Sequence, residues 1–159
     1  MRSAGPRSLV LIAAMIAGVL FPAVSAAAAQ GRPERASPGA ELGRIRSMAE
    51  AQHEIVMLLI RKKEYGQAAA EAGKIFAMNW PVDQEPLLLK ELLFLSDQFV
   101  HNGQPKIGLQ LLEENSKVFR TTPSRASIWK EKGYLHKLLK DDDKALECFR
   151  EARRLESPQ

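Results

Sequence analysis

From Leu42 onward, apolar residues recur at steps of three and four, and this spacing limits the possible folds more than any other feature of the chain. Such a step places the apolar side chains on one face of an α-helix. No run alternates Val, Ile and Thr with polar residues as a half-buried strand would. The sequence therefore predicts an all-α fold. In the first predicted helix, the positions on the buried face are Ile45, Met48, Ala49, Gln52, Val56, Leu59 and Ile60.

Turn and cap residues divide this region into six predicted helices. A glycine-bearing turn at 62–67 ends the first helix, and Pro81 ends the second because a proline disfavours helix in the residue before it. Asp83 is expected to cap the third helix, Gly103 to end it in a left-handed conformation, and Thr122 to cap the fifth. The predicted helices cover about 42–62, 67–78, 83–101, 105–119, 122–140 and 141–156.

The six helices form three pairs of similar length, each joined by a short turn. When the pairs are aligned on that turn, a small residue stands early in each second helix: Ala68, Gly108 and Ala145. The separations are 40 residues (68 to 108) and 37 residues (108 to 145). A small residue is expected where the second helix crosses the first, because a larger side chain would push them apart.

The last pair resembles the tetratricopeptide repeat, whose pattern is W-x₂-L-G-x₂-Y…A-x₃-F…P with a period of 34 residues. Lys132 and His136 replace the usual Leu and Tyr, and the earlier pairs match through fewer residues. The resemblance implies a right-handed superhelical array of three antiparallel helix pairs, a TPR-like α-solenoid over 42–158 with repeats at about 49–82, 89–122 and 126–159. The matching positions are Trp129, Gly133, Ala145, Phe149, Ala152 and, one residue late, Pro158.

The amino-terminal segment has the composition of an export signal. Arg2 and Arg7 precede a charge-free apolar run, Leu9–Val24, and small residues follow with cleavage expected after Ala26 or Ala28. We expect residues 1–26 to be a signal peptide, residues 27–41 a flexible linker, and the protein to be periplasmic or secreted. The alternative is an uncleaved helix that anchors the chain in the inner membrane.

Charge and cysteine content exclude a nucleic-acid-binding domain and a fold held by internal disulfides. Loss of residues 1–26 removes two arginines and lowers the net charge from +4 to +2, too small an excess for a nucleic-acid-binding domain. Cys148 is the one cysteine, so the chain has no internal disulfide, and its place in a helical stretch favours a small, partly buried residue.

No catalytic or metal-binding pattern emerges from the sequence. His53, His101 and His136 fall on three different helices without zinc-ligand spacing. Carboxylates such as Glu113, Glu114 and Asp141–Asp143 are typical of surface and cap positions, and no nucleophile accompanies them. We therefore expect a protein that is not an enzyme and that takes no cofactor and no metal.

The resemblance places the functional surface in a concave groove lined by the first helix of each pair. It implies a protein or peptide partner, and hence an adaptor or scaffold. The alternative is a membrane-anchored accessory or assembly factor of an envelope complex. The carboxyl-terminal end, which no further helix covers in this sequence, is a candidate surface for self-association. The candidate groove residues are Glu50, His53, Met57, Arg61, Lys90, Leu93, Phe94, Asp97, His101, Lys130, Tyr134 and Lys137.

Overall fold

The computed structural model describes residues 37–157, which form six α-helices and two short 3₁₀ turns. No strand occurs within this range, so the predicted all-α class is confirmed. The expected signal peptide and most of the expected linker lie outside the described residues. The helices are α1 (Pro38–Arg61), α2 (Tyr65–Phe76), α3 (Glu85–His101), α4 (Pro105–Asn115), α5 (Thr122–Leu138) and α6 (Asp142–Glu156), with the 3₁₀ turns η1 (Val82–Gln84) and η2 (Ser116–Val118).

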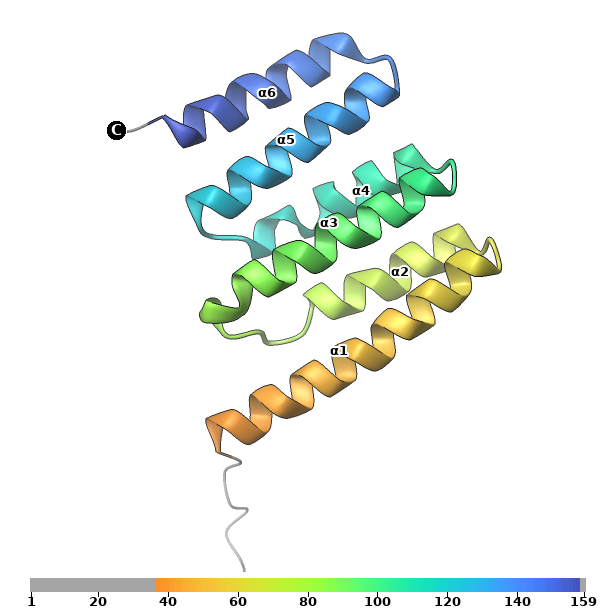
Figure 1. Ribbon diagram of the computed structural model, residues 1–159, viewed down its shortest axis with the longest axis vertical. Coiled ribbons are helices and arrows are strands. Elements are labelled where there is room, and N and C mark those ends of the chain that lie inside the picture. Colours follow the sequence, from red (N-terminus) through yellow and green to blue (C-terminus); the bar gives the residue numbers. More distant parts are fainter. Residues whose placement is uncertain (1–36, 158–159) are drawn as a thin grey trace, which may run out of the picture. The chain divides into compact units, whose positions relative to one another are not determined.

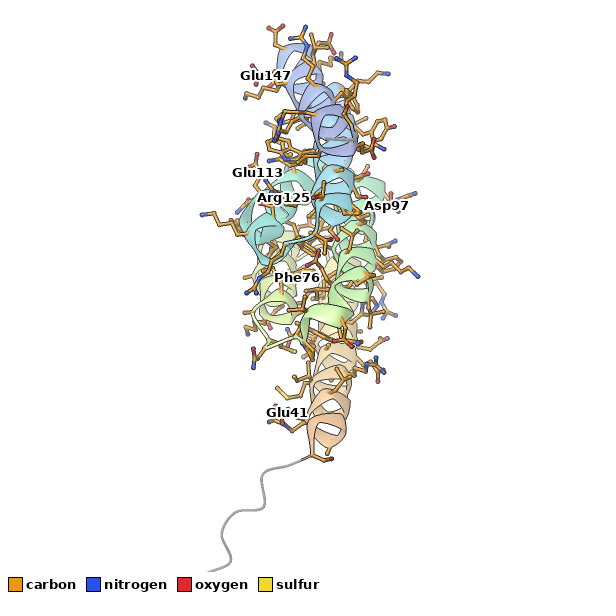
Figure 2. The ribbon with its side chains drawn as sticks, turned by 90° about the vertical axis from the view of Figure 1, so that its left-hand side faces the viewer. Glu41, Phe76, Asp97, Glu113, Arg125 and Glu147 are labelled. Atoms are coloured by element: carbon orange, nitrogen blue, oxygen red, sulfur yellow. The ribbon has the colours of Figure 1, made fainter. Side chains whose placement is uncertain are left out.

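The helices pack in the predicted pairs, α1 on α2, α3 on α4 and α5 on α6. Figure 1 shows the three turns within pairs on one side of this region and the connections between pairs on the other. Successive pairs meet through α2 against α3 and α4, and then through α3 and α4 against α5. Figure 2 shows Asp97 on α3 and Glu113 on α4 on opposite sides of the ribbon, so α3 and α4 form opposite faces of this pair.

The turn within each pair has the same geometry three times. One residue adopts a positive φ, and the N–H of the next residue donates to the carbonyl five positions earlier. This bond gives a donor to a backbone carbonyl near the end of the first helix, which would otherwise have no hydrogen-bond partner. The equivalent turns are 40 residues (63 to 103) and 37 residues (103 to 140) apart, the spacing found in the sequence. Their positive-φ residues are Lys63 (65°), Gly103 (74°) and Lys140 (61°), and their closing bonds run from Glu64 to Leu59, Gln104 to Phe99 and Asp141 to His136.

The first turn is shorter than the predicted range of 62–67, because α2 begins at Tyr65. Gly66 does not make that turn, since it lies inside α2, and Lys63 adopts the left-handed conformation instead. The hydrogen-bond pattern of the turn determines which position is left-handed, and here that position holds a lysine. Gly103 has the predicted left-handed conformation.

Two predicted caps are also displaced. Thr121, not Thr122, caps α5, and its hydroxyl accepts a hydrogen bond from the Ser124 N–H at 3.4 Å. Asp83 lies in η1, and α3 begins two residues later, at Glu85, without a side-chain cap. At the start of α1, the Ser37 hydroxyl accepts from the Ala40 N–H, so this helix begins at Pro38 and not at about Leu42.

The prediction that a small residue stands where the two helices of a pair cross is confirmed at Gly108. Ala68, Gly108 and Ala145 are all buried. A Cβ on Gly108 would lie 2.9 Å from the carbonyl oxygen of Ser96, closer than non-bonded atoms approach. Gly133 serves the same purpose in the third pair, where a Cβ would lie 2.8 Å from the ring of Phe149. In this pair, Gly133 and Phe149 are therefore packing residues, and Ala145 and Ala152 are buried.

Candidate functional site

A groove of about 1010 Å³ lies between α1 and α3. Ala49 and His53 on α1 form one wall, Leu88 and Phe94 on α3 form the other, and Trp80 lies beside them in the connection between pairs. The groove exists because α1 packs closely on α2, whereas α3 packs mainly on α4. Its lining residues are Arg46, Ala49, Glu50, His53, Glu54, Ile75, Trp80, Leu87, Leu88, Lys90, Glu91 and Phe94.

Two polar contacts connect the walls of the α1–α3 groove. His53 Nδ1 lies 2.7 Å from Oε1 of Glu91, and its ring stacks on Phe94 with centroids 5.6 Å apart. Nearer the start of both helices, Arg46 donates to the side-chain oxygen of Gln84 at 2.6 Å. Both contacts are accessible to solvent, so they position the walls without closing the groove.

Large apolar side chains remain available at the groove. Leu87 is 48% exposed and Phe94 is 42% exposed. Trp80 is held in place because its indole N–H donates to the Ile75 carbonyl at 2.8 Å. Lys90 and Glu50 carry opposite charges at the margin. The site therefore combines fixed apolar surface with charges of both signs, which suits a segment with apolar anchors and a polar flank.

The structure brings some of the sequence-predicted residues together and separates others. His53, Lys90 and Phe94 line the α1–α3 groove with Glu50. Met57 and Leu93 are half-buried against the core, so little of either is open to a partner.

The remaining predicted residues lie outside the groove. Arg61 and His101 stand in the last turns of α1 and α3, and the His101 ring hydrogen-bonds the Asp97 carbonyl. On α5, Lys130 and Tyr134 contact α6, whereas Lys137 is exposed in the last turn. Lys130 donates to Glu156, and Tyr134 packs edge-on against Phe149 at 5.1 Å.

Several groove residues escaped the sequence analysis. Leu87, Glu91 and Phe94 stand four and three residues apart on α3, and this helical spacing could have identified the first two as neighbours of Phe94. Arg46 and Trp80 carry no such signal. Trp80 belongs to an irregular connection, and its approach to α1 depends on tertiary packing.

Glu85 is the most strongly perturbed acid among the described residues, and it lies at the junction of the second and third pairs. Its carboxylate is 5% exposed and accepts hydrogen bonds from the N–H groups of Arg120 and Thr121 and from the Thr121 hydroxyl. Burial alone raises its pKa, but these bonds, with help from the Ser124 hydroxyl, outweigh burial and lower the pKa to about 2. Three of these hydrogen bonds come from residues 120 and 121, so Glu85 joins the start of α3 to the segment before α5.

One carboxyl group and the cysteine thiol have raised pKa values among the described residues. Burial raises the pKa of Glu131 on α5, and the negative charge of Asp97 on α3 raises it further. Cys148 is buried, as expected, and burial raises the pKa of its thiol, which makes it unreactive.

The described residues contain neither a metal-binding cluster nor a helix that could span a membrane. No cluster of three or more His, Cys, Asp or Glu side chains within residues 37–157 is arranged to hold a metal ion. None of the helices found there is long and apolar enough to cross a bilayer. The apolar run Leu9–Val24 falls outside this range.

Comparison with known proteins adds no relative. No family model matches the chain, and no curated protein matches it. The assignment to an all-helical domain of three helix pairs therefore depends on the packing described above.

Proposed function

We propose that this protein is a binding module in which the α1–α3 groove holds an apolar segment of a partner protein. The observation that carries the proposal is the groove itself, which leaves Leu87 and Phe94 exposed beside a fixed tryptophan. Exposed leucine and phenylalanine side chains that line one groove lower the free energy of binding when a partner covers them. The groove residues of the proposal are therefore His53, Leu87, Lys90 and Phe94.

The proposal includes the finer architecture, a right-handed superhelical array of the tetratricopeptide type. Three features support it: three turns of equal geometry, a small residue at each crossing, and the contact of Gly133 with Phe149. The connections between pairs are longer than a 34-residue period allows. This extra length separates the present chain from the regular pattern.

The cellular role follows from the amino-terminal segment and is likewise a proposal. The composition of residues 1–26 supports an exported adaptor that acts in the periplasm or outside the cell. The second candidate is an accessory factor of an envelope complex, held in the membrane by the same segment. The run Leu9–Val24 is free of charge, as an anchor requires, but its 16 residues are fewer than the roughly 20 that span a bilayer. Sequencing of the mature amino terminus separates the two, because a start near Ala27 excludes the anchor.

The groove is tested with a matched pair of substitutions. Leu87 and Leu146 are both 48% exposed, but Leu87 lines the groove and Leu146 lies on α6. Peptides selected from a random displayed library against the full chain should bind Leu87→Glu at least about tenfold more weakly, a loss of about 1.4 kcal/mol. They should bind Leu146→Glu as they bind the original protein. Equal binding to both variants would contradict the proposal.

A further inference from the structure

A second cavity, of about 540 Å³, lies where η2 and the chain after it meet α5. Its lining contains cationic and apolar side chains and no acidic one. Phe119 and Ile128 are buried beneath it, and Trp129 is half-buried at its side. This site shares no lining residue with the α1–α3 groove.

Four cations surround the cavity: Lys117, Arg120, Arg125 and Lys132. Lys132 is the most confined, since its side chain is 14% exposed and its ammonium lies 4.4 Å from the centre of the Trp129 ring. This cation–π contact holds the charge over the indole face. The other three are exposed around it.

Nearby acids compensate these charges in part. Glu113 lies 3.9 Å from the Lys132 ammonium, at the limit of an ion pair. The charge of Arg125 lowers the pKa of Glu151, but that carboxylate is bound first by Arg154. Glu85 accepts from the Arg120 backbone, not from its guanidinium. Within residues 37–157, the Lys117 and Arg120 side chains form no ion pair.

We infer that this cavity binds an acidic polypeptide segment of a partner that presents carboxylates around one aromatic or apolar residue. Carboxylates match the exposed guanidinium and ammonium groups, which hold them through charge-assisted hydrogen bonds. The apolar residue covers Trp129 and the surface over Phe119 and Ile128. The structure thus has two binding sites of different chemistry, an apolar groove with mixed charges and a cationic pocket beside a tryptophan.

The test uses a fluorescein-labelled pentapeptide with four glutamates around a central phenylalanine, and the full chain. Fluorescence anisotropy should show binding that weakens with added salt, because the charged groups at the margin are screened. A peptide with glutamine in place of every glutamate should bind at least about tenfold more weakly. Replacing the central phenylalanine by alanine should also weaken binding.

Substitutions then locate the site. Arg120→Glu with Arg125→Glu should weaken binding of the acidic peptide by about tenfold or more. Lys106→Glu reverses one exposed charge at the start of α4, outside all of the cavities described, and should change binding less than about twofold. Circular dichroism of each variant should match the original protein. The single variant Lys117→Glu, in the short η2 turn, should also weaken binding of the acidic peptide.

Several results would overturn the inference. Equal binding of the neutral peptide, unchanged binding by the double variant, or an equal loss in Lys106→Glu would each exclude a specific acidic-peptide site. Binding to phosphatidylglycerol vesicles without binding to the peptide would assign the cations to a lipid surface instead. If Leu87→Glu abolished peptide binding, the peptide would occupy the α1–α3 groove, and this inference would fail while the proposed function stood.

Discussion

Between the first and second pairs, α1 and α3 stand apart and leave a groove, whereas between the second and third pairs a buried carboxylate joins the start of α3 to the segment before α5. At the first junction, the contact between the His53 ring and the Glu91 carboxylate is partly open to water. At the second, the Glu85 side chain makes three hydrogen bonds and is almost fully buried. The second pair therefore meets the first pair through α2, with an open groove beside it, and meets the third pair through a buried polar contact as well as helix packing.

This difference shows that the pairs and their junctions have separate physical origins. Each pair is made by a turn and a crossing that its own residues specify. Each junction is made by side chains from segments far apart in the sequence, such as Glu85 and Thr121. A site for a partner is expected between α1 and α3, because apolar surface that the protein leaves uncovered there is available for binding.

The largest effect is expected when the buried carboxylate is removed. Glu85→Ala leaves the N–H groups of Arg120 and Thr121 without their acceptor, and it should lower the free energy of unfolding by about 4 kcal/mol. Glu91→Ala, at the open junction, should lower it by less than about 1 kcal/mol. Urea unfolding of both variants measures the contrast, and equal losses would show that the junctions do not differ in strength.

Acid should weaken the second junction selectively. Glu85 has a pKa of about 2 in the folded protein, below the ordinary value of 4.5, so its contribution is fully present above about pH 5. As the pH falls from about 5 to 2, the unfolded chain takes up the proton first, and up to about 3 kcal/mol of stability is lost. Urea unfolding gives the free energy of unfolding at each pH, and the values for the original protein and for Glu85→Gln should converge as the pH falls to about 2. A constant difference between the two proteins across this pH range would exclude a lowered pKa of Glu85.

A smaller effect is expected from a crossing within a pair. Gly108→Ala places a Cβ against the Ser96 carbonyl and should cost about 2 kcal/mol. Gly73 is the matched control, since a Cβ there meets nothing within 4 Å, and Gly73→Ala should stabilise α2 by about 0.5 kcal/mol. The midpoint temperature of thermal unfolding should fall for Gly108→Ala and rise for Gly73→Ala. A shift of the same sign would mean that α3 and α4 can separate without loss.

The smallest effect concerns the repeated turn. Lys63→Gly and Lys140→Gly remove the strain of a left-handed lysine, and each should raise the free energy of unfolding by about 0.5 kcal/mol. Gly103→Ala should lower it by a similar or larger amount, because the turn there already holds a glycine. Chemical denaturation of the three variants measures these free energies. A lower free energy of unfolding in Lys63→Gly or Lys140→Gly would show that the three turns are not equivalent.

The positions of the helices could be predicted from the sequence because their causes are local. Apolar spacing identified all six helices among residues 42–156, and Gly103 identified its own turn. The first turn was predicted over 62–67 without identifying Lys63 as its left-handed residue, and the cap of α5 was assigned to Thr122 because Thr121, a residue of equal propensity, stands next to it. Such shifts depend on which backbone groups find partners, and that is decided when the helices pack.

The candidate site could be predicted only in part. Phe94 and Lys90 follow from the exposed face of α3, but Trp80 and Arg46 do not, since no periodic pattern relates them to that face. The importance of Glu85 had no sequence signal at all. Its partners stand 35 and 36 residues away, and a glutamate at the start of a helix is ordinarily a surface residue.

The sequence by itself determined that this chain forms three helix pairs with a small residue early in each second helix, at Ala68, Gly108 and Ala145, because helical periodicity and side-chain size act within a few turns. The tertiary structure alone decided how the pairs join: buried Glu85 links the second pair to the third, and a groove lies between α1 and α3 where the first two pairs meet. The reason is physical. A junction depends on contacts between residues 35 or more positions apart, and their energy depends on burial and geometry that exist only after the pairs have packed.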